Sequence, residues 1–154
     1  GTEKMWDIIL AHRLNVLGLP IMYGLAVDDG HAYHEMPSRA SNPGRGWVQV
    51  LSANLEAGAL IEALEAGQFY ASSGVELKRV EYHYNKLGVE VQPKEGETYV
   101  IEFVGTRRDT DLTGTTVTDE EGKPLHRTKR YSEGVGEVLA RVEGTKAEYE
   151  FAGD

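Results

Sequence analysis

Cysteine is absent from the chain, which excludes disulfide bonds and metal sites built from thiolates. Long apolar runs are also absent: no stretch approaches the roughly 20 residues of a membrane-spanning helix, so no membrane partner is expected. Residues 1–7 lack the basic-then-apolar order of a signal peptide, which leaves the compartment undecided. Basic residues are few, with 16 Lys and Arg against 25 Asp and Glu and a formal charge of −9. Because no basic cluster offsets that charge, the sequence disfavours nucleic acid as a partner.

The first half of the 154-residue chain has the pattern of a sheet flanked by helices. Two segments carry apolar residues at helical spacing, and a glycine follows each of them as a stop signal. Asn54 is the expected N-cap of the second helix and Gly67 its stop. The predicted elements are helix 4–17, buried strand 21–27, polar loop 28–46, strand 47–52, helix 54–67 and strand 69–73. Three short strands make a poor independent sheet, because a strand that is apolar on both faces needs cover on both.

The second half alternates between apolar and polar residues, which favours strands, and turn signals separate the alternating runs. The predicted strands are 75–85, 89–92, 98–106, 115–119, 137–143 and 147–151. This pattern predicts a small antiparallel β-sandwich-like domain without helices. The expected fold class is therefore α+β, with one domain at residues 1–73 and a β-rich domain at residues 74–154. We expect the second domain to be truncated, because the chain stops three residues after the last strand and leaves an unpaired edge.

The stretch DDGHAYH, residues 28–34, follows the apolar run 21–27 and holds an Asp-x-His pair, Asp29 and His31. A carboxylate and an imidazole on a loop that leaves a strand can converge on one ion, and zinc, manganese and iron accept such ligands. The alternative is an ordinary polar loop in which Asp28 or Asp29 only caps a turn. Spacing alone leaves both interpretations open.

Four segments in order carry a resemblance that bears on this choice. They are WDIIL at 6–10, YGLAVDDGHAYH at 23–34, PGRGWVQV at 43–50 and LIEALEAGQFYASSG at 60–74. Together they resemble the last third of the PHP domain, the polymerase-and-histidinol-phosphatase family of metal-dependent phosphoesterases. The resemblance covers about residues 5–75 and implies a segment of a distorted β/α barrel. The β-rich half is similar to the appendage that follows this domain in some bacterial members.

The resemblance also implies roles for individual residues. In the family, two or three divalent ions activate water for attack on a phosphate ester, with zinc, manganese, iron or magnesium as the candidate metals. The closing Asp-x-His motif, which supplies two ligands, corresponds to Asp29 and His31. Arg45, in PGRGW, is the candidate partner of the substrate's phosphate, because a guanidinium matches phosphate oxygens. The alternative for Arg45 is a structural ion pair in a tight loop. The implied substrate is a small phosphorylated molecule.

One departure from the family changes the expectation for activity. The early His-x-His motif and the ligands that follow it are absent, and Asp29 with His31 leave two or more coordination positions to water. We therefore expect a fragment that holds metal weakly or not at all and is inactive in isolation. Missing barrel strands should expose apolar surface on segments 4–17 and 21–27, and self-association into a homo-oligomer would bury it.

Two non-enzymatic alternatives stay open at this point. The β-rich half could be a carbohydrate- or protein-binding module, for which Tyr82, Tyr84 and Tyr99 are the candidate contacts. The chain could also be a structural domain in which Asp29 and His31 hydrogen-bond within the protein. The sequence does not identify the substrate or the metal.

Overall fold

The computed structural model describes residues 2–36 and 41–151. The chain divides into two compact units, of which unit 1 comprises Gly1–Met22 with Leu77–Asp154 and unit 2 comprises Tyr23–Glu76. Unit 1 contains α1 (Thr2–Ala11), η1 (His12–Val16), β3 (Leu77–His83), β4 (Lys86–Val91), β5 (Val100–Gly105), β6 (Thr115–Thr118), β7 (Pro124–Arg130), β8 (Glu137–Glu143) and β9 (Lys146–Glu150). Unit 2 contains β1 (Trp47–Val50), α2 (Ala57–Glu65) and β2 (Phe69–Ser72).

The first helix of unit 1 follows the predicted segment closely. α1 continues into η1, a π-helical turn in which the Leu17 N–H donates to the His12 carbonyl at 3.0 Å. Gly18, at φ +60°, then takes the left-handed conformation that ends many helices. The helix predicted over residues 4–17 is confirmed, with its last turn wound more loosely than an α-helix.

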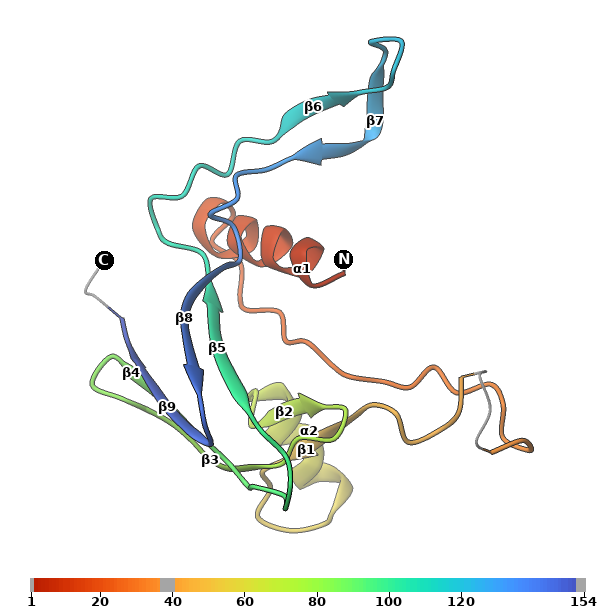
Figure 1. Cartoon of the computed structure of the whole chain (residues 1–154), viewed down its shortest axis with the longest axis vertical. Coiled ribbons are helices and arrows are strands. Elements are labelled where there is room, and N and C mark those ends of the chain that lie inside the picture. The colour runs from red at the N-terminus through yellow and green to blue at the C-terminus, as the bar shows by residue number, and fades with distance from the viewer. Residues whose placement is uncertain (1, 37–40, 152–154) are drawn as a thin grey trace. The chain divides into compact units, whose positions relative to one another are not determined.

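The β-rich part of unit 1 forms small antiparallel sheets with the strand orders β3-β4-β9 and β5-β8, and a separate hairpin, β6-β7. Figure 1 shows β5 and β8 running side by side. Tyr84 and Asn85 both have positive φ, which is the geometry of the tight turn that joins β3 to β4. Val91 from β4, Ile101 and Phe103 from β5 and Ala147 from β9 are buried together. Sheets β3-β4-β9 and β5-β8 therefore share one core.

Unit 2 is built on an antiparallel β1-β2 pair, with α2 lying between these two strands in the chain. The Asn54 side chain accepts the Glu56 N–H at 3.2 Å, but Glu56 is the N-cap of α2, so the N-cap prediction is wrong by two residues. Gly67 ends the helix as predicted, with φ +70°, and the Tyr23 ring packs so closely there that a Cβ would collide with it.

The strand predicted over residues 21–27 does not form. The segment has no regular secondary structure and no sheet partner in the described part of the protein, and Leu25 and Val27 are 63% and 75% exposed. A run that is apolar on both faces becomes a strand only when neighbouring strands and helices cover it. β7 is the opposite case, because the sequence pattern did not predict it.

The described residues thus form short strands in small antiparallel sheets with two α-helices, a mixed α+β composition. The sheets do not close into a barrel within residues 2–36 and 41–151, and the barrel segment stays a prediction. The domains expected at 1–73 and 74–154 also stay predictions. Neither described α-helix has the length and apolar character needed to cross a bilayer.

Candidate functional site

The loop that carries Asp29 and His31 is folded back on itself at its base. The Asp28 carboxylate accepts the Gly44 N–H, which holds the two ends of the loop together. At Gly46 a Cβ would lie 3.0 Å from the Val27 carbonyl oxygen, so glycine permits this close approach of the two backbones. The segment that carries Arg45 is therefore fixed beside the segment that carries Asp29.

A second set of hydrogen bonds closes the loop further along. The His31 and Ala32 N–H groups both donate to the Ser41 carbonyl, at 2.8 and 3.0 Å. The buried Asn42 side chain donates through Nδ2 to the Ala32 carbonyl at 2.7 Å and to the Glu35 carbonyl at 3.2 Å. These bonds satisfy backbone groups that have no sheet or helix partner. They fix the backbone of the motif while its side chains project outward.

Asp29 and His31 lie close together and face solvent. Asp29 has φ +48°, an uncommon conformation for a residue other than glycine. Its Oδ1 is 4.0 Å from His31 Nε2, and the Asp29 and His31 side chains are 86% and 71% exposed. Two ligands of one tetrahedral ion, each about 2.0–2.2 Å from it, stand about 3.3–3.6 Å apart. A small side-chain rotation would therefore bring these two atoms to metal-binding separation.

The remaining polar residues of the loop do not complete a metal centre. No group of three His, Asp or Glu side chains that could hold a metal occurs among residues 2–36 and 41–151. Asp28 is engaged with Gly44, and His34 is exposed. Arg45 is exposed and pairs with no carboxylate in the described part of the chain, so the structural ion pair considered for it is not seen there. Its phosphate-binding role stays a prediction.

The tyrosines proposed for a binding module differ in their exposure. Tyr82 and Tyr84 are 66% and 84% exposed near the β3-β4 turn. Tyr99 is half-buried, and its hydroxyl accepts the Lys94 N–H at 3.0 Å and donates to Glu97 at 2.8 Å. Two of the three rings are thus accessible to a partner.

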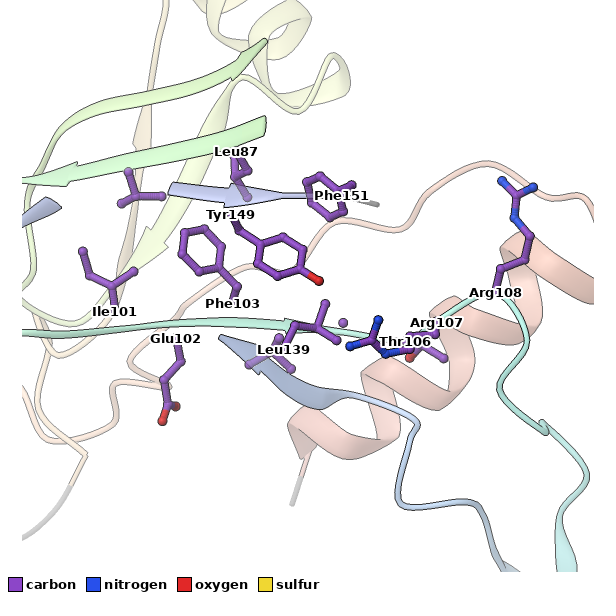
Figure 2. A pocket seen from close by; sticks show the side chains of 13 residues that line it. Leu87, Ile101, Glu102, Phe103, Thr106, Arg107, Arg108, Leu139, Tyr149 and Phe151 are labelled. Atoms are coloured by element: carbon purple, nitrogen blue, oxygen red, sulfur yellow. The ribbon is translucent and has the colours of Figure 1, made fainter. Parts of the chain in front are cut away.

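Unit 1 also contains a cavity of about 420 Å³ that the sequence patterns did not predict. It lies between sheets β3-β4-β9 and β5-β8, and Figure 2 shows Phe103 and Tyr149 at its centre with Thr106 and Arg107 at one end. The adjacent arginines of GTRRD, directly after a strand, were the available sequence signal. The opposing wall comes from β4, which precedes this segment in the chain, and from β9, which follows it, and local patterns cannot bring these strands together.

Comparisons with protein-family models, with curated proteins and with solved structures find no match. Two features of the chain itself bear most directly on its function, the Asp29–His31 loop of unit 2 and the cavity of unit 1.

Proposed function

We propose that the chain carries the closing metal-binding motif of a PHP-type metal-dependent phosphoesterase, with Asp29 and His31 as two ligands of a divalent ion. The observation that carries this proposal is the approach of Asp29 Oδ1 and His31 Nε2 to 4.0 Å on an exposed loop. Its setting is the ordered motif set between residues 6 and 74. Zinc, manganese, iron and magnesium are the candidate ions.

The residues of the loop would divide the chemistry between them. The carboxylate and the imidazole hold the ion, which supplies an activated water when it is bound. Arg45 binds the phosphate of a small phosphorylated substrate, because its planar guanidinium can donate two parallel hydrogen bonds to phosphate oxygens. One carboxylate and one imidazole are fewer than the three protein ligands usual in a catalytic zinc site. Hydrolysis would therefore need ligands beyond this pair, and we expect weak metal binding and no turnover from these 154 residues.

The test is a titration of the protein with Mn²⁺, followed by the paramagnetic broadening of assigned amide signals. We expect selective broadening at residues 28–32 at low metal concentration. His31→Ala should weaken binding about tenfold or more, because the loss of one of two ligands removes the convergent site. His34→Ala is the matched control, since His34 is also exposed and only three residues away. It should bind Mn²⁺ as the wild type does.

Two results would count against local metal binding. One is equal broadening in the His31→Ala and His34→Ala variants, and the other is broadening spread over all acidic surfaces of the chain. Zn²⁺ titrations by calorimetry should give the same order of variants. Metal affinity should fall as the pH is lowered, because both ligands must be deprotonated to bind.

A binding role for the β-rich half is a second candidate function, favoured by the exposure of Tyr82 and Tyr84. Exposed aromatic rings stack on the apolar faces of sugars and on partner side chains. Titration with cellohexaose, followed through the backbone amides of β3 and β4, tests the carbohydrate form. Shifts that disappear in a Tyr84→Ser variant would support it, and unchanged spectra would exclude this ligand.

Self-association would bury the apolar side chains that α1 and η1 leave exposed to solvent. Met5, Ile9 and Val16 are 58%, 48% and 61% exposed on the helical segment of unit 1. Large exposed apolar patches are rare on monomers and usually mark an interface. We propose that a second copy covers this face. Sedimentation velocity should show a concentration-dependent dimer that Ile9→Lys weakens, and a stable wild-type monomer would contradict it.

A further inference from the structure

The cavity in unit 1 has the size and the walls of a small-molecule site. Its volume of about 420 Å³ lies within the range of about 300–1,000 Å³ that is usual for ligand pockets. One wall comes from β4 and β9 and the other from β5 and β8, all within unit 1. The β5-β8 pair shifts register between Phe103 and Val104, two residues that line the cavity.

Aromatic rings form the middle of the cavity. The Phe103 and Tyr149 rings are stacked, with centroids 5.5 Å apart and planes 28° apart. The Phe151 ring meets Tyr149 edge-on at 5.0 Å and 83°. Leu139 closes the side nearer to the polar end (Figure 2). A flat apolar body fits this arrangement, because aromatic faces prefer offset stacking and edge contacts.

One end of the cavity is basic. The Arg107 guanidinium points back toward Leu139, and Arg108 extends outward beyond it (Figure 2). Arg107 donates to Glu137 Oε1 through Nε at 3.0 Å, which uses one of its five N–H donors. Arg108 pairs with no carboxylate in the described part of the chain. Arg108 therefore adds a positive charge at this end, while Glu137 partly offsets the charge of Arg107.

The other polar groups of the cavity fit an anion at the same end. The Tyr149 hydroxyl points toward that end and has no hydrogen-bond partner among the described residues (Figure 2). Glu102, the one acidic residue of the lining, is turned away from the rings and pairs with Arg141. A negatively charged ligand would therefore meet donors and no opposing free carboxylate.

From these features we propose that the cavity binds an aromatic carboxylate. The flat ring system lies against Phe103 and Tyr149, and the carboxylate receives hydrogen bonds from Arg107, with Arg108 adding to the field. This site is independent of the Asp29–His31 pair and lies in the other unit. It would make the β-rich half a sensor or a carrier module for an organic acid.

The test uses the whole chain, with 2-naphthoate as the probe and 2-naphthamide as its neutral analogue of the same shape. We expect 2-naphthoate to bind about five- to tenfold more tightly than the amide, the effect of one charge-assisted contact. Backbone amide signals of Phe103, Thr106 and Tyr149 should shift on titration. Arg107→Gln should remove the preference for the acid and leave the binding of the amide unchanged.

Arg79→Gln is the matched control for this variant. Arg79 is likewise an exposed arginine paired with a glutamate, Glu81, and both residues lie outside the lining of the cavity. The control should keep the full preference for 2-naphthoate. Equal binding of acid and amide by the wild type would overturn the anionic part of the proposal. An absence of shifts at Phe103 and Tyr149 at millimolar probe would overturn the site.

Discussion

The β-rich part of unit 1 and the loop region of unit 2 treat apolar residues in opposite ways. In unit 1, Val91, Ile101, Phe103 and Ala147 are each at most 9% exposed and share one core. In unit 2, Val27 remains mostly in solvent, and the order of the loop comes from hydrogen bonds instead. The difference lies in the sequence pattern. Alternating strands bury one face against each other, whereas a continuous apolar run needs cover on both faces.

The two regions should therefore lose their structure by different routes. The β-rich part depends on the volume and shape of buried side chains. The loop depends on a few polar contacts, and above all on the buried amide of Asn42. Each unit contains one tryptophan, Trp6 in unit 1 and Trp47 in unit 2, so their indole NMR signals report on the units separately.

Phe103→Ala should have the largest effect and would break the core of unit 1. The ring is 7% exposed and stacks on Tyr149, so its removal leaves a cavity that the sheets cannot close. We expect a loss of about 3–5 kcal/mol in the free energy of unfolding. Urea titration followed through the Trp6 indole signal measures it.

Val27→Ala is the control from the other side of the comparison. Because Val27 is 75% exposed, this change should alter the free energy of unfolding by less than about 0.5 kcal/mol. Equal losses for the two variants would mean that the apolar segment before the loop is covered in solution. The contrast between the units would then be wrong.

Asn42→Ala should have an intermediate effect, confined to the loop of unit 2. The substitution removes Nδ2, which donates to the Ala32 and Glu35 carbonyls. A buried carbonyl left without its donor costs about 1–3 kcal/mol of stability. Amide hydrogen exchange at His31 and Ala32 measures the loss, because both N–H groups donate to the Ser41 carbonyl within the same loop. Exchange rates in β4 and β5 should not change. Faster exchange throughout unit 1 would contradict a local role for Asn42.

The sequence predicted the elements that depend on local pattern and missed those that depend on distant partners. β1, α2 and β2 lie within the predicted segments, because spacing and the Gly67 stop signal act over a few residues. β7 was missed because LHRTKR has no apolar alternation, and only pairing with β6 makes it a strand. The segment 21–27 failed for the reverse reason, since its apolar pattern finds no strand to pair with in the described chain.

The candidate site also has one part that local sequence predicts and another that depends on distant contacts. The two-residue spacing of Asp29 and His31 already places their side chains near each other in any tight loop. The separation of 4.0 Å, however, depends on the left-handed backbone of Asp29. That conformation is fixed by contacts such as the one between Asp28 and Gly44, which lie 16 residues apart. The cavity between Phe103 and Tyr149 depends on still longer connections and could not be predicted.

The smallest predicted effect concerns Asp7, a carboxylate that α1 places against the Gly136 turn of unit 1. Burial raises its pKa above the usual 3.8, Lys4 opposes that shift, and Glu3 adds to it. A carboxyl whose pKa is raised in the folded state stabilises the fold fully only below 3.8. Its contribution is lost as the pH rises through the folded-state pKa. The unfolded chain then ionises more readily than the folded one.

Asp7→Asn should therefore stabilise unit 1 at pH 7 by less than about 1 kcal/mol, because most of the side chain remains solvated. The difference in the free energy of unfolding between this variant and the wild type should vanish at pH 3, where the Asp7 carboxyl group is protonated and therefore neutral like the amide that replaces it. Urea titrations at the two pH values, read through Trp6, measure it. Glu90→Gln supplies the opposite sign: the hydrogen bond from Lys78 at 2.7 Å lowers the pKa of Glu90, so that carboxylate stabilises at pH 7 and not in acid. A shift in the same direction for both variants at pH 7 would contradict the opposite pKa shifts of Asp7 and Glu90.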